Sequence, residues 1–327
     1  MRGDTVLGHI LRPINDYLND PSVTNIAVNA PFEIWVRKDG VWTSHSVPSF
    51  DFDTLDAASI LISQRTGREF DSGRPYVNST LPGGQRWQGV RPPGTKDGRI
   101  LWAIRRPPSN ARTMDDEDFP GLFSRTNSGT SRRSKALSDL GAMYKNREWD
   151  SLCRAARASG ASIGLCGPTD SGKTDLIRRF IGKARPNARM VTIETDDELG
   201  EIGPANRASL LYDEAQVSSD EAVRIALRLS PKEIVVQEIR GAEAYSMLRA
   251  LRSGHNGLTS FHADVGEEYT ALGMMVRHHP AGREIPEERL MEMVSTAFDI
   301  IAHCEYSEED GWKVSALKMW AAEQEMA

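Results

Sequence analysis

Residues 167–174 read Gly167, Pro168, Thr169, Asp170, Ser171, Gly172, Lys173 and Thr174, which completes the phosphate-loop pattern Gly-x4-Gly-Lys-Thr. An apolar run at 162–166 predicts a strand before it, and residues 173–183 predict a helix after it. Glycines let such a loop curl its N–H groups toward a phosphate, and the helix adds its positive end. The loop therefore predicts nucleotide binding, with Lys173 on the β- and γ-phosphates and Thr174 as a Mg²⁺ ligand.

The sequence beyond the loop alternates strand and helix patterns. Strands are expected at 190–193, 234–236 and 258–261, and helices at 218–229 and 242–253. Ser218 and Glu221 have the spacing of a capping box, and Gly254 stands where a helix C-cap belongs. This alternation predicts a mostly parallel sheet covered by helices, so the expected fold class is α/β.

Residues 1–108 have a different pattern, which predicts a smaller α+β domain. Strands are expected at 23–28, 33–37, 41–42, 87–90 and 100–104, with a helix at 55–64. Residues 109–145 include a polar stretch with almost no apolar side chains, which is typical of a linker. The expected organisation is an N-terminal domain at 1–108, a linker at 109–145 and the nucleotide-binding domain at 146–327.

Composition narrows the classes of protein to consider. The formal net charge is −6, which weighs against a protein whose main role is to coat nucleic acid. The three cysteines lack the spacing of a metal site or a disulfide framework, which favours a reducing cytosol. No uncharged apolar run is long enough to span a membrane. We therefore expect a cytoplasmic protein that meets a membrane peripherally or through a partner.

Two carboxylates follow predicted strands of the nucleotide-binding domain. Glu194 ends the strand at 190–193, and Glu238 follows the strand at 234–236 as a Walker-B-type residue. Ligands of open α/β sheets bind at this edge, so both are expected to be catalytic, with Glu238 also a Mg²⁺ ligand. For Glu198 two interpretations stay open, a further acid of this edge or an exposed surface residue. Arg240 is either a residue of the nucleotide site or half of an ion pair at a helix N-terminus.

The segment 254–263 contains two histidines. His262 follows the predicted strand at 258–261, so we expect it near the γ-phosphate, whose presence it would sense. His255 is included among the nucleotide-binding candidates. A zinc site is not favoured, because neither a cysteine nor a third ligand is near in sequence.

Together these segments resemble one family, the secretion traffic ATPases, and within it the type IV secretion and conjugative-transfer branch. The resemblance rests on the phosphate loop, residues 191–194 (Val-Thr-Ile-Glu), 238–244 (Glu-Ile-Arg-Gly-Ala-Glu-Ala) and 254–263, in that order. It extends into the first domain at residues 20–26, 80–86 and 103–107. One departure is Ile193-Glu194-Thr195-Asp196, where the family usually has Ile-Glu-Asp.

The resemblance implies more than the residues alone. It implies a RecA-like P-loop NTPase core, ATP hydrolysis, and a homohexameric ring at the inner membrane that works with membrane components of a secretion machine. It also implies that Arg86 and Arg105 reach the nucleotide phosphates from the first domain; the alternative is a pair of surface arginines around a hairpin. Two other functions stay open: a RecA-like nucleic-acid motor, which the acidic balance weighs against, and an ATP-binding assembly scaffold with little turnover.

Overall fold

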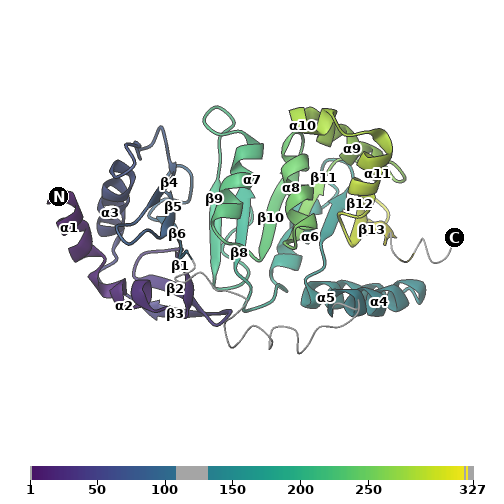
Figure 1. Cartoon of the computed structure of the whole chain (residues 1–327). Coiled ribbons are helices and arrows are strands. Elements are labelled where there is room, and N and C mark those ends of the chain that lie inside the picture. Colours follow the sequence, from purple (N-terminus) through teal and green to yellow (C-terminus); the bar gives the residue numbers. More distant parts are fainter. Residues whose placement is uncertain (1, 108–131, 320–321, 323–327) are drawn as a thin grey trace, which may run out of the picture.

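The computed structural model describes residues 2–107, 132–319 and 322, and within them the chain forms two β-sheets (Figure 1). The first sheet has six strands in the order β3-β2-β1-β6-β5-β4, and all of its neighbouring pairs are antiparallel. Its strands are β1 (Val23–Val28), β2 (Glu33–Lys38), β3 (Val41–Ser46), β4 (Tyr76–Thr80), β5 (Arg86–Val90) and β6 (Leu101–Arg105).

Helices pack on the first sheet and close its core. They are α1 (Arg2–Ile10), α2 (Asn15–Asn19) and α3 (Phe52–Gln64), with a short 3₁₀ turn at Arg12–Ile14. Helix α3 begins at the cap Asp51, whose carboxylate accepts from the Thr54 N–H. The core includes Trp87 and Trp102, whose rings meet edge to face at 6.1 Å. The Trp102 indole N–H donates to Ser59 on α3 at 2.8 Å, which joins helix to sheet.

The second sheet has seven strands in the order β13-β12-β7-β11-β10-β8-β9. All its neighbouring pairs are parallel except β12 and β13, which form an antiparallel hairpin. Its strands are β7 (Ile163–Cys166), β8 (Met190–Glu194), β9 (Arg207–Leu211), β10 (Glu233–Ile239), β11 (Asn256–Phe261), β12 (Ile300–Ser307) and β13 (Gly311–Lys318). The expected α/β class with a mostly parallel sheet is confirmed.

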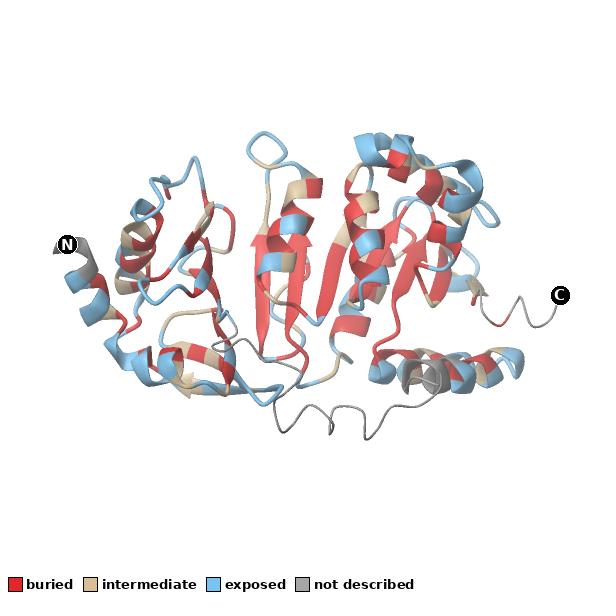
Figure 2. Cartoon of the chain, in the orientation of Figure 1, coloured by how far each residue is buried: buried red, intermediate tan, exposed pale blue. Residues whose placement is uncertain are grey.

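Helices accompany the second sheet, and Figure 2 shows the buried residues concentrated on its strands and on the inner sides of these helices. They are α4 (Arg132–Lys145), α5 (Trp149–Ser159), α6 (Lys173–Ile181), α7 (Ser219–Arg228), α8 (Glu243–Arg252), α9 (Glu268–His278), α10 (Pro280–Arg283) and α11 (Glu287–Ser295). The capping box at α7 is confirmed, because the Glu221 N–H donates to the Ser218 hydroxyl at 3.3 Å.

The structure describes only part of the expected linker at 109–145. Residues 108–131 lie outside the described residues, whereas Arg132–Lys145 forms helix α4, which packs against α5. The hydroxyl of Tyr144 on α4 donates to the carbonyl of Leu317 on β13 at 3.1 Å. The last part of the segment that we expected to be a linker is therefore a helix attached to the second sheet.

The first sheet lies beside the β9 edge of the second (Figure 1). The Leu211 N–H donates to the Gly94 carbonyl at 3.0 Å, and the Thr95 hydroxyl donates to the Ser209 carbonyl at 2.7 Å. Deeper in this contact, the guanidinium of the fully buried Arg189 donates to the side-chain oxygen of Asn29 at 2.9 Å. These contacts fix which part of the second sheet the N-terminal part of the chain, residues 2–107, covers.

Candidate nucleotide-binding site

The phosphate loop connects β7 to α6 in a backbone conformation that requires glycine at both ends. Gly167 has φ of 139°, and a Cβ there would lie 2.1 Å from the carbonyl oxygen of Cys304 on β12. Gly172 has φ of 81° and caps α6. Because neither position accepts a side chain without strain, the glycines of the pattern determine how this loop curls. The loop thus ends at a helix N-terminus, as an anion cradle does.

Lys173 lies inside the curl of the loop. Its ammonium donates to the carbonyl of Gly167 at 2.9 Å and to that of Pro168 at 2.5 Å, and the residue is only 8% exposed. Burial lowers the pKa of this ammonium below its usual value. The geometry therefore holds a desolvated cation at the loop, where it attracts an anion more strongly than a solvated lysine would. Thr174 follows in the first turn of α6 and is half-buried.

Two of the expected catalytic side chains meet beside this loop. Glu238 lies near the end of β10, and His262 follows the last residue of β11. The Nε2 atom of His262 is 2.9 Å from the Glu238 carboxylate, and its Nδ1 atom is 3.1 Å from the Gly167 carbonyl oxygen. The structure therefore brings Glu238, His262 and the start of the phosphate loop together.

Arg240 holds the other side of the Glu238 carboxylate. Its guanidinium lies 2.5 Å from that carboxylate, while the arginine side chain itself is 73% exposed. The Glu243 carboxylate instead accepts the Gly241 N–H at 2.9 Å, at the start of α8. Of the two alternatives for Arg240, the structure shows it beside the Glu238 carboxylate at the nucleotide edge, and Glu243 makes the contacts at the helix N-terminus.

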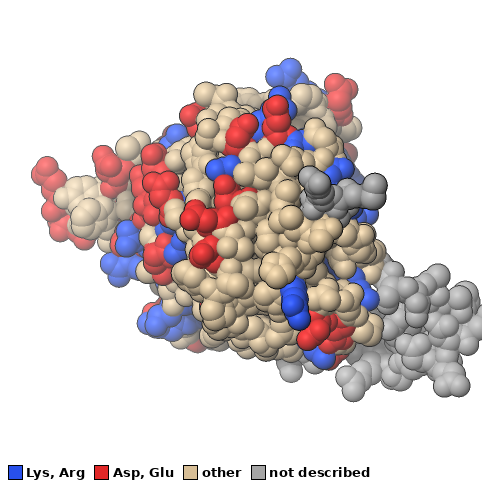
Figure 3. Space-filling view, turned by 90° about the vertical axis from the view of Figure 1, so that its left-hand side faces the viewer, with Lys and Arg blue, Asp and Glu red and all other residues tan. Residues whose placement is uncertain are grey.

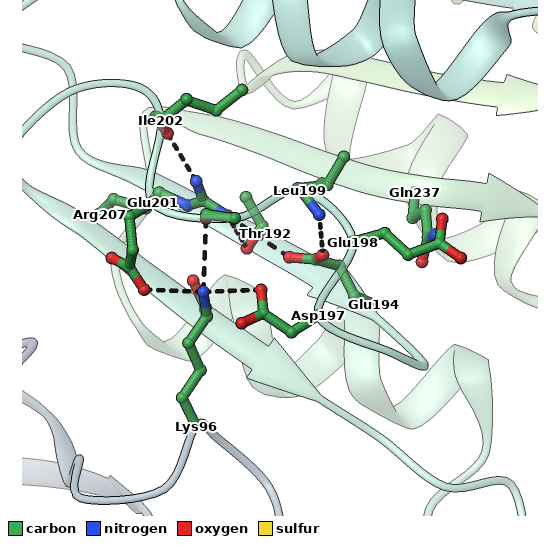
Figure 4. A network of polar contacts seen from close by, with 12 residues as sticks. Lys96, Thr192, Glu194, Asp197, Glu198, Leu199, Glu201, Ile202, Arg207 and Gln237 are labelled. Atoms are coloured by element: carbon green, nitrogen blue, oxygen red, sulfur yellow. Dashed lines mark hydrogen bonds and ion pairs between the residues drawn. The ribbon is translucent and has the colours of Figure 1, made fainter.

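Glu194 is enclosed by residues of its own strand and of the segment that follows (Figure 4). It is fully buried at the end of β8, where its carboxylate accepts the Leu199 N–H at 2.8 Å and lies 3.4 Å from the Arg207 guanidinium. Burial raises the pKa of this carboxyl above its usual value. By contrast Glu198 is exposed, and its carboxylate accepts from the amide of Gln237, the residue before Glu238.

The segment between β8 and β9 also forms ion pairs with the N-terminal part of the chain. Lys96, in the connection between β5 and β6, forms ion pairs of 2.7 Å with both Asp197 and Glu201 (Figure 4). The segment between β8 and β9 thus encloses Glu194 and presents Glu198 toward Gln237 on β10. Through Lys96 it also contacts the N-terminal part of the chain.

The remaining candidates lie near the other end of the second sheet's strands, where β10 and β11 begin. Arg86 and Arg105 pair across β5 and β6, and they line a cavity of about 540 Å³ together with Arg228 and Ser230, just before β10. His255 precedes β11, and its Nδ1 atom is 3.2 Å from the Pro231 carbonyl oxygen. Because the phosphate loop lies where the parallel strands end, the structure does not bring these three residues to it within one chain.

Sequence comparisons identify the family of this chain. The family model described as "Type II/IV secretion system protein" matches residues 128–284. Protein VirB11 of Agrobacterium tumefaciens is 31% identical over 92% of this chain and 90% of its own length. The chain belongs to the VirB11 family of type IV secretion ATPases. The chain is also similar to the type IV secretion system protein PtlH of Bordetella pertussis, which is 30% identical over 95% of this chain and 93% of its own length.

The fold agrees with that of a solved VirB11 protein. The crystal structure of the VirB11 ATPase from the Brucella suis type IV secretion system superposes with a TM-score of 0.90 at 28% identity, covering 99% of this chain and 98% of that one. The expected secretion traffic ATPase with a RecA-like core and a smaller N-terminal part is therefore confirmed. No helix in the described part of this VirB11-family chain is long and apolar enough to cross a membrane.

Sequence reasoning overlooked one side chain at the loop of this VirB11-family chain. Trp312 on β13 donates its indole N–H to the Asp170 carbonyl at 3.1 Å and is 71% exposed. The signal in the sequence was Gly311, which is typical of a hairpin turn, followed by residues that alternate between apolar and polar. That run shows a strand, but the sequence alone does not show that this strand lies beside the phosphate loop.

Proposed function

We propose that this chain hydrolyses ATP at the 167–174 loop and that the reaction powers export through, or assembly of, a type IV secretion system. The single observation that carries the proposal is the contact of His262 with both the Glu238 carboxylate and the Gly167 carbonyl. Hydrolysis needs an anion cradle and a group that positions the attacking water, and a histidine beside them could respond to the γ-phosphate. These three lie next to one another here.

The loop residues would bind the nucleotide phosphates. The backbone of residues 167–172 and the helix N-terminus would hold the β-phosphate, and the Lys173 ammonium would turn from the loop carbonyls toward the β- and γ-phosphates. The Thr174 hydroxyl and the Glu238 carboxylate would hold Mg²⁺, because hard oxygen donors suit this cation. When bound, Mg²⁺ neutralises charge that develops on the transferred phosphoryl group.

The acids around the loop would divide the remaining work. Glu238, held by Arg240 and His262, would orient the attacking water. For Glu194 to act directly on water, its carboxylate would have to leave Arg207 and the Leu199 N–H. We therefore propose that Glu194 acts by shaping the segment that presents Glu198 next to Gln237 and Glu238.

A ring of identical subunits would complete the site. Arg86 and Arg105 lie in the first sheet, on the side where β10 begins, and so away from the phosphate loop of their own chain. In a homohexamer, the N-terminal part of one copy would present these arginines to the nucleotide of the next copy, where their planar guanidinium groups grip phosphate oxygens. We propose such a hexamer at the cytoplasmic face of the inner membrane, bound peripherally to membrane components of the secretion machine.

The charge distribution on one face weighs against a nucleic-acid motor. Figure 3 views the molecule from the side of the N-terminal part, and on it lysines and arginines are interspersed with aspartates and glutamates. Nucleic-acid binding depends on clustered positive charge that contacts phosphates. This face shows no continuous basic stripe among the described residues.

The test is phosphate release from Mg²⁺-ATP by the purified full chain and by Glu238→Gln. We expect Glu238→Gln to reduce turnover on the order of 100-fold or more, because the water loses its orienting carboxylate, while ATP still binds. Equal turnover in the two proteins would overturn the assignment. Near-zero turnover in the assembled wild-type ring, together with ATP-dependent binding to a membrane partner, would favour the assembly scaffold instead.

A further inference from the structure

The β12–β13 hairpin presents two aromatic side chains beside the phosphate loop. Tyr306 and Trp312 are paired across the hairpin, with ring centroids 5.3 Å apart. Trp312 donates its indole N–H to the Asp170 carbonyl, and a Cβ on Gly172 would lie 3.0 Å from its ring. The indole is therefore held against the loop by a hydrogen bond and by van der Waals contact.

Most of this aromatic surface is open to solvent. Trp312 is 71% exposed and Tyr306 is 54% exposed, and the neighbouring Val314 on the same hairpin is 47% exposed. Large apolar side chains that gather at the surface commonly mark a binding site. Since these side chains adjoin the loop that binds phosphate, the ligand that would cover them is the rest of the same nucleotide.

The order of strands gives the direction in which a bound nucleotide extends. Strand β7 leads into the loop, with β11 and then β10 on one side and β12 and then β13 on the other. Glu238 and His262 belong to the β10 and β11 side, where the γ-phosphate is expected. A nucleotide extends in sequence from the γ-phosphate to the ribose and base, so its base leaves the loop toward β12 and β13.

We propose that Trp312, with Tyr306 beside it, is the stacking surface for the base of the bound nucleotide. The inference rests on the proposed nucleotide site. The flat indole face offers a base a large contact area at little cost in conformational entropy, because its N–H is already fixed to the loop. Stacking uses the π face that every base has, so this surface favours a nucleotide over a bare phosphate chain without reading the edges of the base.

The test compares two ligands that share phosphates but not the base. Calorimetric titration of the full chain with Mg²⁺-ADP and with inorganic tripolyphosphate is repeated for Trp312→Ala. We expect the ADP affinity to fall about 10-fold, the scale of losing one base–aromatic stack, and the tripolyphosphate affinity to stay unchanged. Trp312→Phe keeps an aromatic face and should retain most of the ADP affinity.

Two controls make the outcomes distinct. Trp149→Ala removes another exposed tryptophan, on α5, and should leave both affinities unchanged. Wild-type ADP affinity in Trp312→Ala overturns the stacking surface, and so does an equal loss for ADP and tripolyphosphate, because the indole would then support only the loop. If Lys173→Ala binds both ligands as wild type does, the nucleotide site itself is wrong. Unchanged thermal unfolding of Trp312→Ala shows that its fold is intact.

Discussion

The imidazole of His262 lies 2.9 Å from the Glu238 carboxylate through Nε2, while Nδ1 lies 3.1 Å from the Gly167 carbonyl oxygen. Both neighbours are oxygen atoms, one on the carboxylate and one on the backbone of the loop. One side chain thereby joins the end of β11 to the carboxylate on β10 and to the start of the loop after β7.

His262→Ala should separate catalysis from binding. Without the imidazole, the Glu238 carboxylate loses its contact with Nε2 and is held less firmly beside the loop, so we expect ATP turnover to fall about 10- to 100-fold. ADP affinity should change little, because ADP lacks the γ-phosphate. Phosphate release and ADP titration measure the two effects. The matched control is His45→Ala, on β3 of the first sheet, where the side chain contacts Tyr17; equal damage from both variants would contradict the site.

Lys173→Ala should remove the cation inside the loop. The transition state then loses a preorganised positive charge, and we expect turnover to fall on the order of 100-fold or more. Steady-state phosphate release at saturating Mg²⁺-ATP measures this loss. Lys183→Ala, at an exposed position just after α6, serves as the control and should hydrolyse ATP normally. Wild-type turnover in Lys173→Ala would refute the loop as the reacting site.

Glu194 and Glu198 should respond to substitution in different ways. Glu194→Ala removes the acceptor of the Leu199 N–H and leaves the buried Arg207 guanidinium without its carboxylate, so we expect it to lower the free energy of unfolding by about 1–3 kcal/mol. Glu198 is exposed beside Gln237, so Glu198→Gln should leave stability unchanged and reduce turnover. Urea unfolding and phosphate release measure the two effects. A stable Glu194→Ala with no turnover would instead support direct catalysis by Glu194.

The buried Glu194 carboxyl should also give stability a specific pH dependence. Burial raises its pKa in the folded chain above the ordinary value of 4.5, so the folded state binds this proton more tightly than the unfolded state. Its contribution to the free energy of unfolding therefore decreases as pH rises from about 4.5 through the folded pKa, and is constant above it. Wild type minus Glu194→Gln, measured by urea unfolding from acidic to neutral pH, should show this decrease. A difference that grows with pH would contradict it.

Arg189 should stabilise the attachment of the N-terminal part to the second sheet. Its guanidinium donates to Asn29 and to the Leu229 carbonyl, and it lies over the Trp42 ring. Arg189→Ala leaves buried acceptors without donors, and we expect it to cost about 3 kcal/mol of unfolding free energy. Thermal unfolding should detect this, together with faster proteolysis. Arg179→Ala breaks an exposed pair with Asp175 and should cost about 0.5 kcal/mol or less; a similar cost for both would argue against the buried role.

Local patterns predicted much of the second sheet because its elements are set by nearby residues. The loop glycines and the capping box at Ser218 act over a few positions, so the strand before the loop and helix α7 could be located. Strand β9, which starts at Arg207, was not expected, because its sequence has no clear alternation. It is a strand because it pairs with β8 along its length.

The site was less predictable because it depends on contacts between distant parts of the chain. The enclosure of Glu194 depends on Arg207, which belongs to the next strand. The position of Arg86 and Arg105 depends on which edge of the second sheet the N-terminal part covers, and a sequence pattern does not encode that choice. Trp312 reaches the loop only because β12 inserts beside β7.

The phosphate loop is supported by the β12–β13 hairpin, and this has a consequence for biosynthesis. Gly167 lies so close to Cys304 on β12 that a Cβ on Gly167 would clash with the Cys304 carbonyl. The loop and Trp312 are joined by a hydrogen bond between residues 142 positions apart, so the hairpin that supports the loop is made long after the loop itself. On the ribosome, the nascent chain exposes residues 167–174 before β12 and β13 exist. We therefore expect a chain ending at residue 299 to have no tight affinity for ADP, which would keep unfinished subunits from competing for nucleotide or entering an assembly.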